Sequence, residues 1–159
     1  MTVGALLDLG ADRHVLEHAL ESLGVGGYHL HFGRKNVCGL DSYDFDVHLE
    51  EDGHEHDHPH SHEDHHGHSH VHQHGDGHPL VHRNLFDIYQ IIDKLESNDR
   101  VKELARRMFR IVAEAESKAH GLPIDQVHFH EVGAIDSIVD IISVAVCVDN
   151  LGVDDVVVS

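Results

Sequence analysis

The chain has 159 residues, enough to bury one ordinary hydrophobic core, so we expect a single domain. Its 29 acidic residues against 11 basic ones give a formal net charge of −18, which argues against nucleic acid or an anionic membrane as a partner. The sequence shows no signal-peptide pattern, its longest apolar run contains Asp140, and Cys38 and Cys147 form no CxxC motif. We therefore expect a cytoplasmic protein with reduced thiols.

Two short helices are predicted at the N-terminus. The first covers residues 3–9 and ends at Gly10, and Asp12 then caps a second helix that runs to Leu23. Apolar residues recur at helical spacing in the second helix and predict its buried face: Val15, Leu16, Ala19, Leu20 and Leu23.

Two strands are predicted next, at residues 28–32 and 43–49, because apolar and polar residues alternate there. Paired as an antiparallel ribbon, these strands would gather polar side chains on one face: His29, His31, Asp44, Asp46 and His48. Such a face could bind a metal ion, but a solvated polar face is the interpretation that we favour.

A histidine-rich segment follows, with 12 histidines in the 25 residues 54–78 and almost no apolar residue. It cannot bury enough surface to offset the entropy of ordering, so we expect a long disordered insert over residues 50–81. Neutral imidazole is a good ligand for nickel, zinc and copper, and the segment is internal and rich in acids, unlike a purification tag. We therefore predict metal ligands at His54, His56, His58, His60, His62, His65, His66, His68, His70, His72, His74 and His78.

Two further helices are predicted after the insert. Asn84 caps the first, which runs to about Ser97, and Asp99 caps the second, residues 100–119, before Gly121. The buried stripe predicted for the second helix consists of Val101, Leu104, Ala105, Met108, Val112 and Ala115. Three arginines on this helix could hold a phosphate, but ion pairs with helix neighbours are the simpler interpretation: Arg106, Arg107 and Arg110.

The segment 127–149 contains the string HFHEVGAIDSIVDI and then a helix, residues 134–150, that is apolar on nearly every side. Asp136, Asp140 and Ser143 would form a polar stripe on this buried helix. One hypothesis is a metal site made by His128, His130, Glu131, Asp136 and Asp140. The alternative, which spacing alone favours, is that the histidines lie on the outer face of a short strand while the aspartates cap helices.

This string, together with GALLDLG at residues 4–10 and AEAESKAHG at residues 113–121, resembles the nickel insertion proteins of nickel-pincer cofactor biosynthesis. The resemblance covers almost the whole chain outside the insert. It implies that Ni²⁺ is placed into pyridinium bis-thiocarboxylate mononucleotide, with CTP and Mg²⁺ or Mn²⁺ driving the formation of nickel–sulfur and nickel–carbon bonds. The chain contains no glycine-rich phosphate loop, so we expect the CTP site in a C-terminal half, fused or separately encoded, that this sequence lacks.

The sequence thus predicts an α+β fold, with a helical core packed on a small sheet and a long disordered His-rich insert. Its parts are residues 1–49, the insert at 50–81, and residues 82–159, which end in a strand at 153–159; all belong to one domain, expected to be a fragment of a longer protein. Nickel delivery and insertion is the leading function. A non-enzymatic nickel or zinc store and a metal-dependent hydrolase with Glu131 as base remain alternatives, and oligomerisation stays open.

Overall fold

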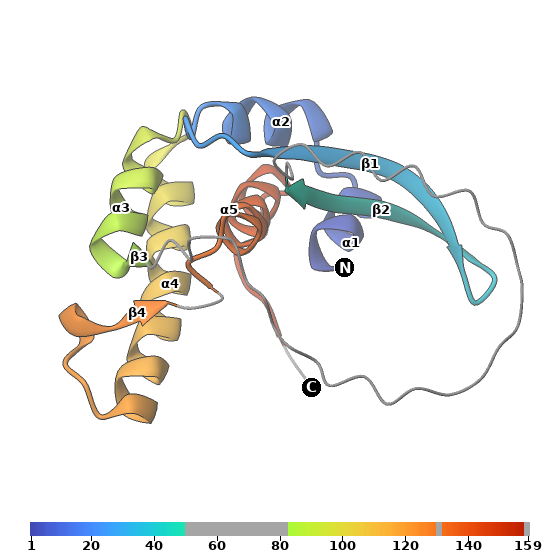
Figure 1. The fold of residues 1–159 in the computed structure, drawn as a ribbon. Coiled ribbons are helices and arrows are strands. Elements are labelled where there is room, and N and C mark those ends of the chain that lie inside the picture. The colour runs from blue at the N-terminus through green and yellow to red at the C-terminus, as the bar shows by residue number, and fades with distance from the viewer. Residues whose placement is uncertain (50–82, 130–131, 158–159) are drawn as a thin grey trace, which may run out of the picture.

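The computed structural model describes residues 1–49, 83–129 and 132–157 (Figure 1). The insert predicted at residues 50–81 lies outside the described residues. The described part is α+β, as predicted, with two small antiparallel sheets beside its helices. Its elements are α1 (Thr2–Asp8), α2 (Arg13–Glu21), β1 (Tyr28–Val37), β2 (Leu40–Leu49), β3 (Arg83–Asn84), α3 (Leu85–Lys94), α4 (Asp99–His120), the 3-10 helix η1 (Ile124–Gln126), β4 (His128–Phe129) and α5 (Ile135–Asn150).

Helix α5 lies in the centre of the fold, as its apolar sequence predicts. It contacts α1, α2, α4 and β2, and Figure 1 shows these elements arranged around it. A helix that is covered on several sides must be apolar on several sides, because an uncovered polar group there would lose its hydration. Its buried residues are Ile138, Val139, Ile142, Ser143, Ala145, Val146 and Cys147.

Side-chain caps set the starts of three helices. The Asp12 carboxylate accepts a hydrogen bond from the His14 amide at 2.8 Å, and Asn84 and Asp87 form a reciprocal capping box on α3. The prediction for α4 was wrong by one residue, because Asn98 and not Asp99 is its cap. The Asn98 side chain reaches the Val101 amide at 2.9 Å, so the carboxylate of Asp99 is left in the first turn.

The buried face of α4 differs from the predicted stripe. Val101 and Ala105 are buried as expected, but Ala115 is exposed, and Phe109 and Ala113 are buried in its place. The true face follows a four-residue spacing, whereas the prediction followed the longer aliphatic side chains, which flank this face. Val15 of α2, also predicted to be buried, is 44% exposed.

The strands β1 and β2 form the predicted antiparallel ribbon, and both are longer than predicted. Val37 pairs with Leu40, so Cys38 and Gly39 alone make the turn. Their φ angles are +53° and +83°, the combination that a type I′ hairpin turn requires. Glycine accepts this conformation freely, while Cys38 adopts it at a steric cost.

Two further features complete the fold. The strands β3 and β4 form a second, very short antiparallel pair. The strand predicted at residues 153–159 is wrong for the described residues 153–157, because no neighbouring strand pairs with them.

Within the described part of the chain, no helix has both the length and the apolar content that a membrane crossing demands.

Candidate functional site

The first candidate site lies where the β4 strand leads into α5. Asn84 of β3 pairs with His128 of β4, and the Arg83 guanidinium donates a hydrogen bond to the Gly133 carbonyl at 2.6 Å. Gly133 fits tightly here, because a Cβ at this position would lie 2.9 Å from the carbonyl oxygen of Phe129. The glycine of the HFHEVGA string therefore permits the close turn that delivers the chain to α5.

The structure separates the predicted ligands. His128 is exposed on β4, as the alternative interpretation expected, while His130 and Glu131 lie outside the described residues. Asp136 lies in the first turn of α5, where the helix dipole favours a carboxylate. Among the described residues, no three His, Cys, Asp or Glu side chains are grouped so that they could hold a metal ion. The predicted site of five ligands thus remains a prediction, and so do the twelve ligands of residues 54–78.

The polar stripe on α5 does not form a single environment. Ser143 is fully buried, and its hydroxyl donates to the Val139 carbonyl at 2.6 Å, so it serves the helix itself. The Asp136 Oδ1 atom is also buried, and it has no hydrogen-bond partner among the described residues. Asp140, one turn later, is an exposed residue. Of these three side chains, only Asp136 has a buried polar atom without a hydrogen-bond partner among the described residues.

The pKa of the Asp140 carboxyl is raised, chiefly by partial burial. The nearby Met1 amino group lowers this pKa, and the carboxylates of Asp136 and Asp46 raise it again. Burial and the carboxylates of Asp136 and Asp46 therefore disfavour the charged form of Asp140. A cation at this end of α5 would relieve the repulsion.

We expect Asp140→Asn to stabilise the isolated chain near pH 7. A carboxyl whose pKa is raised by folding contributes its full stability only below its unfolded pKa, and that contribution is lost as pH rises through the folded pKa. Because Asp140 is exposed, the gain should be small, roughly 0.2–1 kcal/mol. Urea unfolding near pH 7 and near pH 3.5 measures it. The gain should be clearly smaller at the lower pH. An equal gain at both pH values would contradict the assignment, as would the same gain in the exposed control Asp155→Asn.

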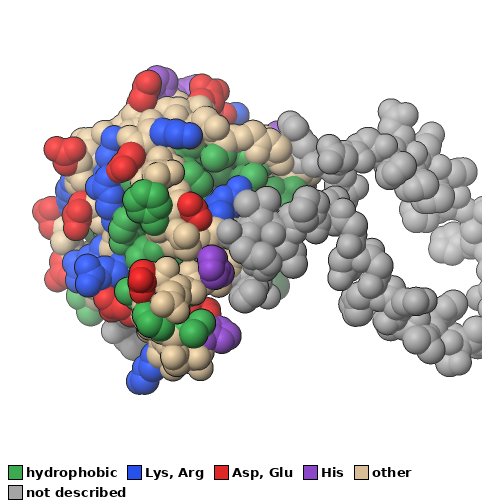
Figure 2. All heavy atoms as spheres, turned by 60° about the vertical axis from the view of Figure 1, so that its left-hand side comes forward, with side chains coloured by type: hydrophobic (Ala, Val, Ile, Leu, Met, Phe, Trp, Pro, Cys, Tyr) green, Lys and Arg blue, Asp and Glu red, His purple; other side chains and the backbone are tan. Residues whose placement is uncertain are grey.

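Of Arg106, Arg107 and Arg110 on α4, two form ion pairs among the described residues, but only Arg110 pairs with a neighbour on its own helix, as the simpler interpretation predicted. Arg110 pairs with Glu114 at 2.9 Å, and Arg106 pairs with Asp93 of α3. Figure 2 turns this side of the molecule forward and shows acidic and basic side chains intermingled. An uninterrupted basic surface for phosphate binding is therefore absent from this face of the described chain.

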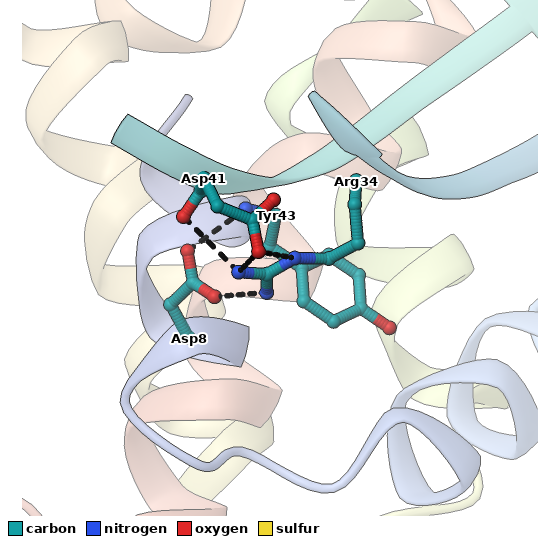
Figure 3. A network of polar contacts seen from close by, with 4 residues as sticks. All are labelled: Asp8, Arg34, Asp41 and Tyr43. Atoms are coloured by element: carbon teal, nitrogen blue, oxygen red, sulfur yellow. Dashed lines mark hydrogen bonds and ion pairs between the residues drawn. The ribbon is translucent and has the colours of Figure 1, made fainter. Parts of the chain in front are cut away.

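A polar cluster that the sequence did not reveal joins α1 to the ribbon (Figure 3). The Arg34 guanidinium donates to the carboxylates of Asp8 and Asp41, and the second oxygen of Asp8 accepts from the Tyr43 amide at 2.8 Å. That amide hydrogen bond, followed by Arg34, lowers the pKa of Asp8. Gly4 also touches Tyr43, because a Cβ there would lie 2.5 Å from its carbonyl oxygen. Two residues of the GALLDLG string, Gly4 and Asp8, thus contact Tyr43 and hold α1 against β2.

A second candidate site is the outer face of the ribbon. His29 lies opposite His48, and their rings are stacked with centroids 5.1 Å apart. His31 lies opposite Asp46 on the same face. The polar face predicted from the alternation is therefore confirmed, with its imidazoles in contact range.

Comparison with known proteins decides the family. The family model described as "Nickel insertion protein" matches residues 1–159, the whole chain. The chain belongs to the nickel insertion protein family. The resemblance that the HFHEVGAIDSIVDI string suggested is thereby confirmed.

Relatives in this nickel insertion protein family are similar over the full chain. Proteins named pyridinium-3,5-bisthiocarboxylic acid mononucleotide nickel insertion protein share 54% identity in Alkaliphilus metalliredigens, over 100% of this chain and 36% of the relative. Identity is 38% in Acetivibrio thermocellus, over 98% of this chain and 34% of the relative, and 36% in Geobacillus kaustophilus, over 99% and 34%. The chain thus spans about a third of the length of these relatives. No solved structure matches it.

Proposed function

We propose that this chain is the nickel-handling part of a protein that inserts nickel into pyridinium-3,5-bisthiocarboxylic acid mononucleotide. The observation that carries the proposal is the match of the nickel insertion family over residues 1–159, together with a relative of that printed name at 54% identity. The composition supports it, because 21 histidines supply the imidazole donors that suit Ni²⁺. We further propose that the protein works in the cytoplasm, where thiols such as Cys38 stay reduced.

Nickel is the cargo in this proposal, and the chain's own residues bind and release it. Imidazole nitrogens hold a borderline cation well, while the thiocarboxylate sulfurs of the substrate are softer ligands that can take it over. We assign the segment of His128, His130, Glu131, Asp136 and Asp140 as a nickel site close to that transfer. Its support is the buried, unpaired Oδ1 atom of Asp136 among the described residues and the exposed imidazole of His128.

The resemblance also implies CTP with Mg²⁺ or Mn²⁺ as the source of driving force. We place that site in the part of the relatives that extends beyond their match to this chain, whether it is fused or separately encoded. The supporting observations are the lack of a glycine-rich phosphate loop in the sequence and the paired arginines of α4.

A chimaera tests the proposal. The matching third of the A. metalliredigens relative is replaced by this chain, and nickel in the mononucleotide is measured by mass spectrometry after incubation with substrate, Ni²⁺ and CTP. We expect insertion, and we expect the double variant His128→Ala, His130→Ala to lower its rate by about 10 to 100-fold, the usual effect of losing metal ligands or their supports.

The matched control removes two exposed imidazoles elsewhere, His14→Ala with His18→Ala, and should insert nickel like the parent chimaera. An inactive chimaera beside an active natural relative would contradict the proposal. So would equal rates in the two double variants, which would remove the His128 segment from the transfer. A chimaera that binds nickel but never inserts it would favour the alternative of a histidine-rich metal store.

A further inference from the structure

The outer face of the β1–β2 ribbon carries four metal-ligating side chains in one patch. His29 and His48 are directly opposite, with ring planes 13° apart, and the His31 ring stands edge-on to His48 with centroids 6.1 Å apart. The His48 Nε2 atom lies 3.5 Å from the Asp46 Oδ2 atom. All four residues are exposed, so each ring can turn toward an ion that arrives from solvent.

Folding does not account for these residues. The inner face of the ribbon supplies the packing, where Phe32 lies against Phe45 with ring centroids 5.3 Å apart and Phe45 is buried. The outer face makes no such contribution, and β-branched residues such as Thr or Val would support a solvated strand face better than three imidazoles do. The ribbon would hold its register without any of its outer histidines.

Gly33 gives a second, independent indication. It lies inside β1, where a glycine weakens a strand, and its φ is not positive, so no turn requires it. A Cβ at Gly33 would lie 3.1 Å from the His31 Nε2 atom, closer than an ordinary contact. The missing side chain therefore leaves the space that the metal-binding edge of the His31 ring occupies.

We propose that this face of the ribbon binds one borderline divalent cation through His29 and His48, with His31 and Asp46 completing its coordination. The identification of the cation as nickel depends on the proposed function, whereas the site itself follows from the geometry of the ribbon. Imidazole nitrogens that share an ion lie roughly 3 Å apart, since each is about 2.0–2.1 Å from the metal. Opposite positions on antiparallel strands, with Cβ atoms about 4.5–5.5 Å apart, bring two imidazoles within that reach.

The site forms on binding. Among the described residues no three such side chains are already grouped as a metal cage, so the stacked rings must tilt until their nitrogens converge. Exposed side chains change rotamer within nanoseconds, so this ordering is fast, and its entropy cost makes the site weaker than a rigid cage. An exchangeable site suits transfer, and along the sequence the 12 histidines of residues 54–78 begin five residues after the end of β2.

The test uses the full chain with the twelve histidines of residues 54–78 replaced by asparagine, and with His128→Asn and His130→Asn added so that the site proposed on that segment does not compete; it is called the loop-Asn variant. Calorimetric titration with NiCl₂ should show one equivalent on the ribbon. Adding His29→Asn, His31→Asn and His48→Asn should lower its affinity by at least about tenfold. The matched control replaces the exposed His14, His18 and His120 by asparagine and should leave this affinity unchanged.

A second readout locates the ion without any ribbon mutation. Six-coordinate Ni²⁺ is paramagnetic, so it should broaden the amide NMR signals of residues 28–32 and 45–49 in the loop-Asn variant before any others. Unchanged affinity in the ribbon triple variant, loss of binding in the control, or broadening centred elsewhere would each overturn the site. Nickel insertion by the chimaera is read in the mononucleotide, so failure of the ribbon site is distinguishable from failure of the proposed function.

Discussion

Replacing the twelve histidines of residues 54–78 by asparagine should remove most of the nickel that the full chain binds near pH 7.5. A chain segment with that many imidazoles can supply several ligands to each of several ions. Only neutral imidazoles bind, so the natural chain should lose these ions as pH falls through about 6. Equilibrium dialysis with NiCl₂ near pH 7.5 and near pH 5.5 measures both effects.

The control for this experiment keeps the histidines and changes the acids of residues 50–81 to their amides. If imidazole is the ligand, this variant should bind nearly as many ions as the natural chain. Equal stoichiometry at the two pH values, or loss of binding in the amide variant alone, would show that the carboxylates hold the metal. The fold should persist in both variants, because the described core is built without residues of this segment.

The largest loss of stability is expected from Phe109→Ala. The Phe109 side chain is 0% exposed on the buried face of α4, and its removal leaves a cavity that the surrounding helices cannot fill by collapse. The expected loss in the free energy of unfolding is about 3–5 kcal/mol, a large part of the stability of a domain of this size. Urea unfolding followed by circular dichroism measures it.

Phe86→Ala supplies the matched control, because it deletes the same atoms from a side chain that is 67% exposed. Its effect should stay within about 0.5 kcal/mol. Comparable losses in the two variants would contradict the assignment of Phe109 to the buried face of α4.

The helices and the ribbon could be predicted because each rests on a local pattern. The capping residues Asp12 and Asn84, the alternation in β1 and β2, and the apolar run of α5 all act within a few residues. The errors arose where the answer depends on a distant partner. Residues 153–157 have the composition of a strand, but a strand also needs a neighbour, and composition cannot supply one.

The candidate site was predictable in its residue types and not in its arrangement. The polar face with His29 and His48 follows from the period of two, whereas the separation of Ser143 from Asp140 depends on which helices cover α5. The Arg34 cluster was missed because its partners, Asp8 and Asp41, come from elements whose packing no short motif reveals. Arg34 lies opposite Tyr43 and Asp41 lies opposite Asn36, so the two charges are diagonal neighbours, and both fall outside the strands predicted at residues 28–32 and 43–49.

The central position of α5 also bears on how the chain is made. Among the described helices it comes last along the chain, yet it contacts α1, α2 and β2, which end more than eighty residues before it begins. Helix α1 and the β1–β2 ribbon can contact one another before α5 is made, but the apolar faces that they turn toward α5 stay uncovered until it emerges. A stop codon before residue 135 would remove the helix that covers these faces, so we expect the shortened polypeptide to be unstable and not merely inactive.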